Sequence, residues 1–93
     1  IIEQAKQQFQ KEHGSLYCEV CGFDFASVYG RRGKGFIEGH HKTPIAQMKD
    51  GDTTSVDDIA MVCSNCHSML HRQPFLSVQE LRELMQNMRK QSK

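Results

Sequence analysis

Two pairs of cysteines with the same spacing constrain the fold of this chain more than any other feature. Two residues separate the cysteines of each pair, and residues 22–62 separate the pairs, which are Cys18/Cys21 and Cys63/Cys66. Each pair can supply two thiolates to a tetrahedral ion, so the four cysteines can form one structural zinc site. With 93 residues, of which 38% are hydrophobic, the chain makes a single domain with a thin core, which a metal would stabilise.

Three alternatives use some of the same residues. Disulfides within the pairs would be strained, and disulfides between the pairs need an oxidising compartment, for which nothing in the sequence argues. The stretch CSNCH at 63–67 also matches the attachment pattern of c-type haem, but haem would leave Cys18 and Cys21 without a role. A zinc deaminase needs a glutamate two residues after its ligand histidine, and neither His40 nor His67 has one.

Most of the histidines lie in two short segments that this zinc site would draw together. His40 and His41 are adjacent, and His67 and His71 are four residues apart, on one face of a helix expected over 65–72. With one member of the doublet they can offer three imidazoles to a divalent ion. Neighbouring side chains on a strand point to opposite faces, so the other member is free to take a proton from water. The alternative is a set of surface histidines beside a zinc finger.

Short strands and a zinc knuckle are expected around these ligands. The stretch GFIEGHH at 35–41 and the stretch DIAMVC at 58–63 each predict a strand, and Asp50-Gly51 predicts a turn in the polar segment between them. The stretch LYCEVCGFDF at 16–25 predicts a knuckle that turns at Gly22.

A helix is expected at each end of the chain. Residues 1–12 are strong helix formers, with Ile2, Ala5 and Phe9 on one face. After Pro74, Ser77 and Glu80 make a capping box for a second helix. Its apolar stripe predicts core packing and consists of Val78, Leu81, Leu84, Met85 and Met88. We therefore expect a small α+β domain with an N-terminal helix (1–14), a zinc-stapled core (15–73) and a C-terminal helix (74–93).

Charge and hydropathy indicate which partners and which cellular compartment to expect. The net charge is only +1, but Arg31, Arg32 and Lys34 form a basic cluster with three glycines, which predicts a flexible loop, either solvated or bound to phosphate. The sequence contains no membrane span and no signal peptide, so we expect a cytoplasmic protein. Because the chain begins with Ile1, we expect it to be part of a longer protein.

Residues 36–72, together with Cys18 and Cys21, resemble the HNH endonucleases. These carry a ββα-metal fold, similar to a treble clef, around one ion, and some variants add a four-cysteine zinc. The resemblance implies that His41 is the general base and His40 a metal ligand. It also implies that His67 and His71 are ligands, the latter as in colicin-type nucleases, which share an acidic residue at the position of Glu38. The colicin-type nucleases lack the cysteines. The sequence therefore resembles the cysteine-bearing restriction enzymes, including modification-dependent ones, more closely.

The resemblance also implies a substrate and cofactors. It predicts hydrolysis of DNA phosphodiesters with Mg²⁺, Mn²⁺, Ni²⁺ or Zn²⁺ at the histidines and structural Zn²⁺ at the cysteines. Asp58 stands where the family usually has the asparagine that orients the base, and it can accept hydrogen bonds but not donate them. Arg72 and the basic cluster are candidates for phosphate contacts. A homodimer and a specificity module elsewhere in the parent chain are expected; the alternative is a non-catalytic, zinc-stapled module that binds nucleic acid or protein.

Overall fold

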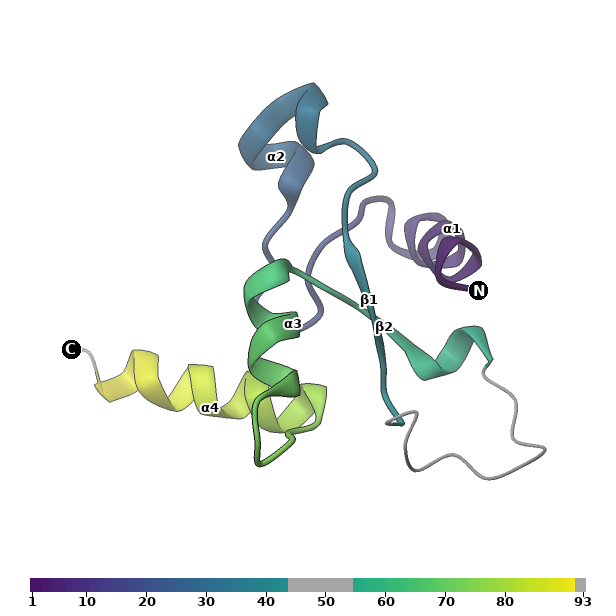
Figure 1. Cartoon of the computed structure of the whole chain (residues 1–93). Helices are drawn as coiled ribbons and strands as arrows, with labels where there is room; N and C mark the ends of the chain where they lie inside the picture. Colours follow the sequence, from purple (N-terminus) through teal and green to yellow (C-terminus); the bar gives the residue numbers. More distant parts are fainter. Residues whose placement is uncertain (44–54, 92–93) are drawn as a thin grey trace.

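A two-stranded antiparallel hairpin lies between helices at the centre of the molecule (Figure 1). Strand β1 spans Glu38–His41 and strand β2 spans Ile59–Val62, with His40 opposite Ala60. Both predicted strands are confirmed. The computed structural model describes residues 1–43 and 55–91, so the turn expected at Asp50-Gly51 lies outside the described residues.

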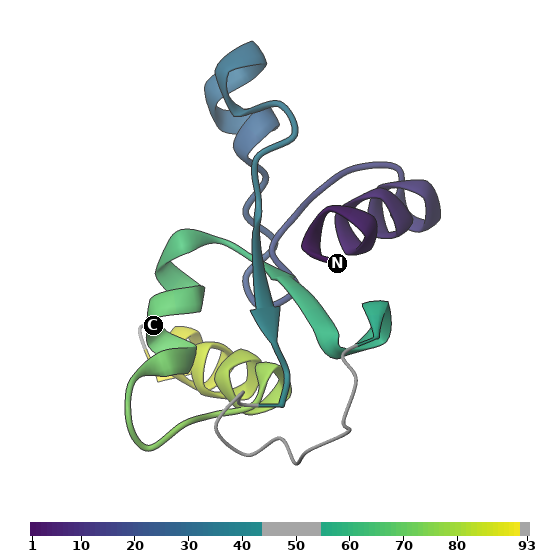
Figure 2. The same ribbon diagram turned by 45° about the vertical axis from the view of Figure 1, so that its right-hand side comes forward.

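Helices cover both faces of the hairpin, which explains why all of β2 is buried. On one face, Ile59 and Met61 pack in a cluster with Ala5 of α1 (Ile2–His13). On the other, Ala60 and Val62 pack with Leu70 of α3 (Ser64–His71). Figure 2 shows α1 and α3 on opposite sides of the crossing strands. The strand therefore alternates between two cores with the ordinary period of two.

Helix α1 confirms the helix predicted at the N-terminus. Ala5 is buried, and Ile2 and Phe9 pack partly buried beside it. The helix lies so close to β1 that a Cβ built on Gly39 would come within 2.8 Å of the Ile2 side chain. Any larger residue at position 39 would require the Ile2 side chain to move.

The zinc knuckle turns where the sequence predicts it. Gly22 has φ of +80°, a left-handed conformation that glycine adopts without steric cost, and its N–H donates to the Cys18 carbonyl at 2.8 Å. The knuckle is tied to β2 because the Glu19 N–H donates to the Met61 carbonyl, at 2.8 Å, and the Met61 N–H donates to the Glu19 carboxylate, at 2.6 Å.

The basic segment is not the flexible loop that the sequence predicts. Residues Phe25–Tyr29 form the short helix α2, and Gly30–Gly33 form the 3-10 turn η1 directly after it. Asp24 caps α2 by accepting from the Ser27 N–H at 3.2 Å. A five-residue helix is too short to show an apolar period, so the sequence pattern does not reveal it.

Helix α4 (Val78–Gln91) begins at the predicted capping box. The Ser77 N–H donates to the Glu80 carboxylate at 2.8 Å, and the Glu80 N–H donates to the Ser77 hydroxyl at 3.1 Å. Leu81 is buried, and Val78 and Met85 pack against the same core partly buried, but Leu84 is 47% exposed and Met88 is 54% exposed. Only part of the stripe therefore belongs to the core. In the described part of the chain, no helix combines the length and apolarity that crossing a membrane requires.

Candidate metal centres and active site

The four cysteines converge on one point between the knuckle, the end of β2 and the start of α3. Their sulfur atoms all lie within 4.8 Å of one another, and all four thiols are free. The Cys21 and Cys63 sulfurs are 3.7 Å apart. A zinc tetrahedron with bonds of about 2.3 Å has edges of about 3.8 Å, so the donor set fits a zinc ion.

The electrostatics of the cluster also favour a cation. Burial raises the pKa of the Cys66 thiol, and the neighbouring Cys18 raises it further. Burial works in the same direction on Cys18, but hydrogen bonds with the backbone of Cys21, Cys63 and Val20 and with the Cys21 side chain together outweigh it and lower its pKa. Four thiolates at this spacing repel one another unless a positive ion lies between them, and a bound metal keeps a coordinating thiol deprotonated.

Three histidines form a second cluster between β1 and α3. The donor atoms of His40, His67 and His71 lie within 4.8 Å of one another. The Nε2 atoms of His67 and His71 are 3.1 Å apart, close to the roughly 3.3 Å expected between two nitrogens on one tetrahedral ion. The two helix histidines face the strand because they are one turn apart on the same side of α3.

Glu38 orients His67 within this cluster. One carboxylate oxygen lies 2.7 Å from the His67 Nδ1, and the other accepts from the Ser64 hydroxyl at 2.7 Å. These bonds, first to His67 and then to Ser64, hold the pKa of Glu38 below its usual value. An ionised Glu38 accepts the Nδ1 proton, which leaves the lone pair of Nε2 facing the cluster. Glu38 and His40 share this face because they are two residues apart on β1.

His40 is buried with an unsatisfied nitrogen. Its side chain is 8% exposed, and its Nδ1 has no hydrogen-bond partner among the residues that the structure describes. Burial, and then the charges of His71 and His67, lower its pKa to about 4. The ring is therefore neutral at neutral pH, and a metal ion would satisfy a buried nitrogen that otherwise costs free energy.

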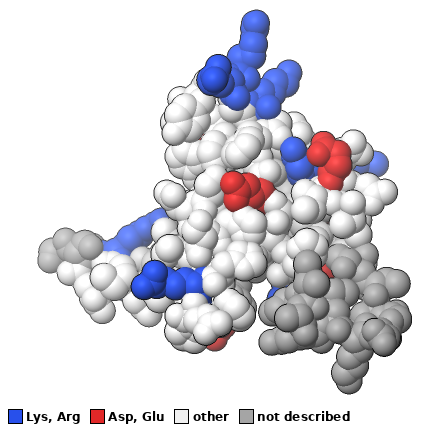
Figure 3. All heavy atoms as spheres, viewed as in Figure 1, with Lys and Arg blue, Asp and Glu red and all other residues white. Residues whose placement is uncertain are grey.

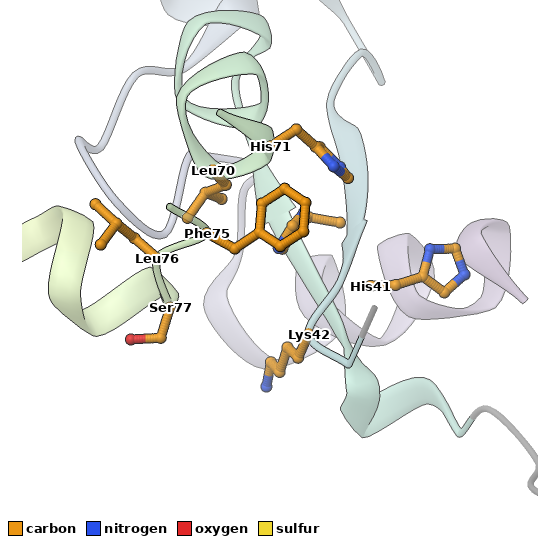
Figure 4. Close-up of a pocket in the computed structure, with 8 residues that line it drawn as sticks. His41, Lys42, Leu70, His71, Phe75, Leu76 and Ser77 are labelled. Atoms are coloured by element: carbon orange, nitrogen blue, oxygen red, sulfur yellow. The ribbon is translucent and has the colours of Figure 1, made fainter. Parts of the chain in front are cut away.

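His41 lies on the other side of β1 and is half-buried. Its ring points away from His71 in the close-up view (Figure 4), although it contributes to the wall of an adjacent cavity of about 220 Å³. The rest of the wall comes from β1, α3 and the segment before α4, namely His40, Lys42, Leu70, His71, Phe75, Leu76 and Ser77. No group in residues 1–43 or 55–91 hydrogen-bonds the His41 ring.

The remaining predicted site residues lie apart from the histidine cluster. The Asp58 carboxylate accepts from the Ser55 N–H at 3.1 Å and closes the 3-10 turn η3 (Val56–Asp58). Its carbonyl accepts from the Lys42 N–H at 2.8 Å, directly after His41. Arg72 lines a groove between α3 and α4. Arg31 and Arg32 of the basic cluster lie on η1, and Lys34 directly follows this turn.

Two residues near the site were not predicted from the sequence. Lys42 lines the cavity, and its Nζ donates to the Asp57 carbonyl at 2.9 Å. Phe75 is 52% exposed and lies beside His71 in Figure 4. Lys42 follows the doublet directly, which was a usable signal. Phe75 carries no such signal because its position depends on how the chain turns between α3 and α4.

Comparison with known proteins places this geometry in a family. A search of curated proteins and a search of solved structures found no significant match. A comparison with family models matches residues 18–73 to the HNH endonuclease family. The match covers more than half of the chain and includes both cysteine pairs, the hairpin and α3. The chain therefore belongs to the HNH endonuclease family and is a phosphodiester hydrolase.

Proposed function

We propose that this domain is a metal-dependent DNA endonuclease in which His40, His67 and His71 hold one divalent ion and His41 is the general base. The observation that carries the proposal is the convergence of three imidazoles, one of which Glu38 holds with its free nitrogen toward the others. A bound Mg²⁺, Mn²⁺, Ni²⁺ or Zn²⁺ would act as a Lewis acid that neutralises charge on the phosphate and on the leaving oxygen.

His41 suits the role of base because it is adjacent to the ion ligands but directed elsewhere. Its ring takes a proton from water as the water oxygen attacks phosphorus. The bond from phosphorus to the 3′ oxygen then breaks, and the leaving oxygen gains a proton from solvent. The backbone bond from Lys42 to Asp58 holds the end of β1 in place. Asp58 is thus a positioning residue in this proposal, acting through the strand that carries His41.

The cysteine cluster would hold a structural Zn²⁺ that keeps this arrangement together. It joins the knuckle to the end of β2 and to the first turn of α3, the elements that flank the histidine site. A closed four-thiolate site has no open position for substrate, as expected of a structural rather than a catalytic zinc.

The biological setting we propose is cleavage in a restriction-type enzyme, with DNA as the substrate. This setting is supported by the resemblance between the four-cysteine HNH pattern of this chain and the pattern in restriction enzymes. The low net charge of +1 suggests that a specificity module lies elsewhere in the parent chain. Cutting both strands of a duplex needs two active sites, so we propose that the enzyme acts as a homodimer. Arg72 is a further proposed phosphate contact.

Cleavage of a supercoiled plasmid tests the assignment of His41. We expect nicking and linearisation in Mg²⁺, Mn²⁺ or Ni²⁺, none in EDTA, and a loss of at least about a hundredfold in His41→Ala. His13→Ala is the matched control, because His13 lies at the end of α1, outside the cluster. Equal cleavage by wild type and His41→Ala would overturn the assignment. A folded domain that binds DNA but never cleaves it would instead indicate a non-catalytic binding module.

A further inference from the structure

The short helix α2 and the turn η1 form a tip that projects from one end of the molecule (Figures 1 and 2). Its base is a group of aromatic rings: Phe25 contacts Phe36 at 4.8 Å and stacks on Tyr29 at 6.2 Å, measured between ring centroids. Gly33 packs against the backbone of Phe25, where a Cβ would come within 2.2 Å of the carbonyl oxygen. The tip is thus a packed unit with a defined shape.

Three basic side chains at this tip have no ion-pair or hydrogen-bond partner in the described part of the chain. Arg31, Arg32 and Lys34 are exposed, and none of them forms an ion pair or a side-chain hydrogen bond with residues 1–43 or 55–91. Basic side chains gather over this end in the space-filling view, while the acidic side chains visible there lie lower on the molecule (Figure 3).

The tip differs from the rest of the described chain because three unpaired cations lie there within four residues. Four other described cations also lack an ion pair or side-chain hydrogen bond, but they are spread over α1, the end of α3 and α4, namely Lys11, Arg72, Arg89 and Lys90. The remaining ones are engaged. Lys6 pairs with Glu3 at 3.7 Å, Lys42 donates to the Asp57 carbonyl at 2.9 Å, and Arg82 donates to the Glu19 carbonyl. The one acidic residue at the base of the tip, Asp24, caps α2 through the Ser27 N–H. Positive charge is therefore concentrated at the tip even though the whole domain carries only +1.

We propose that this tip binds backbone phosphates of the DNA strand outside the step that is cleaved. Two guanidinium groups can each donate a pair of hydrogen bonds to phosphate oxygens, and Lys34 adds a point charge. The hydroxyl of Tyr29, which is 60% exposed, adds a donor of the kind that commonly contacts phosphate. The inference rests on the proposed function, because it takes the nuclease substrate as the ligand.

The chain limits how far this contact lies from the cleavage site. Lys34 precedes His40 by six residues, so their Cα atoms are at most about 20 Å apart. At about 3.4 Å of rise per nucleotide, this backbone distance corresponds to roughly six nucleotides, and the reach of the side chains at both ends adds to it. Such contacts hold the duplex and set its register but carry no sequence information.

Binding of a labelled duplex, followed by fluorescence anisotropy across a salt series, tests the proposal. All proteins carry His41→Ala to prevent cleavage. The tip variant adds Arg31→Gln, Arg32→Gln and Lys34→Gln. The matched control removes the same charge from exposed positions on α1 and α4, with Lys11→Gln, Arg89→Gln and Lys90→Gln. Circular dichroism verifies that both variants fold.

We expect the tip variant to bind at least about tenfold more weakly at low salt and its salt slope to fall by about 2 to 3, since each lost phosphate contact removes about 0.9. The control should bind as the parent does. Equal binding by the tip and control variants would overturn the proposal, because charge alone would then account for the loss.

Hydrolysis of bis(p-nitrophenyl) phosphate by the protein with an intact His41 separates this proposal from the proposed function. The small diester fits the metal site but cannot reach the tip. If it is hydrolysed while the tip and control variants bind duplex equally, the tip proposal fails and the nuclease proposal stands. If it is not hydrolysed but only the tip variant binds duplex more weakly, the tip is a phosphate-binding site of a protein that does not cleave, and the nuclease proposal fails.

Discussion

Glu38 is the residue on which the geometry of the histidine cluster depends most. It contacts His67 and Ser64 at 2.7 Å each, and so links β1 to the first two turns of α3. A carboxylate in this position fixes both the tautomer and the angle of a ligand histidine, and losing such a partner typically weakens metal binding by about 10- to 100-fold.

We therefore predict that Glu38→Ala lowers the affinity of the histidine site for Ni²⁺ by about 10- to 100-fold. Calorimetric titration measures this loss, and elemental analysis verifies that zinc in the cysteine cluster is unchanged. Glu12→Ala, on the exposed side of α1, serves as the control and should bind Ni²⁺ as wild type does. Unaltered affinity in Glu38→Ala would show that packing alone orients His67.

At the scale of elements, the capping box of α4 predicts a pH effect. Hydrogen bonds from the Ser77 backbone, and then from its hydroxyl, lower the pKa of Glu80 from its usual 4.5. Because the folded pKa is the lower one, this cap contributes fully above the unfolded value and is lost as the pH falls through the folded value.

Glu80→Gln should therefore be less stable than wild type at neutral pH, with the difference shrinking as the pH is lowered past the folded pKa of Glu80. Melting curves of both proteins, recorded from about pH 7 to about pH 3, measure this difference. Any effect of acid on the metal sites is common to both proteins and cancels in the comparison. A stability difference between the two proteins that stays constant with pH would show that the ionised Glu80 does not stabilise the cap.

Close packing between α2 and η1 gives a second prediction at this scale. Gly33→Ala places a Cβ against the Phe25 carbonyl, so η1 must shift away from α2, at a cost of about 1 to 3 kcal/mol. Gly35→Ala is the comparison, since a Cβ there meets no atom within 4 Å and is opposed only by its φ of +77°. Denaturant titration measures both variants, and near-ultraviolet circular dichroism reports the aromatic rings. If Gly33→Ala costs no more than Gly35→Ala, the tip is looser than the structure shows.

At the scale of the whole molecule, the cysteine cluster joins the knuckle, the end of β2 and the first turn of α3. Three of its members belong to the larger buried cluster, together with Val20 of the knuckle, Val62 of β2 and Leu81 of α4. Without an ion, mutual repulsion of the thiolates and the high pKa of Cys66 oppose this convergence. Metal binding at such a site contributes directly to the free energy of folding.

Removal of metal with a strong chelator under reducing conditions should thus unfold the domain, and zinc should restore it. Far-ultraviolet circular dichroism and melting temperature measure the change. Cys63→Ser should show the same loss without chelator, while His71→Ala, which alters only the other cluster, should keep its helical content. Full retention of structure without metal would mean that packing alone holds the two cores.

Much of this architecture was predictable because its signals are local. Helix α1, the two strands, α3 and the capping box of α4 each have a period or a cap within a few residues of sequence. The short helix α2 was missed because five residues show no period. Leu84 and Met88 of the α4 stripe were wrongly expected in the core. An apolar face shows that burial would be favourable, but it does not show whether another element packs against every part of it.

The sequence by itself determined which residues can bind metal. Two cysteines with two residues between them, or two histidines one helical turn apart, bring their donor atoms together through backbone geometry alone. Only the tertiary structure decided which histidine of the doublet faces α3, which nitrogen of His67 remains free, and where the basic tip lies. The reason is that pairing register assigns alternate side chains of β1 to opposite faces, and the helices packed on those faces then determine what each side chain meets.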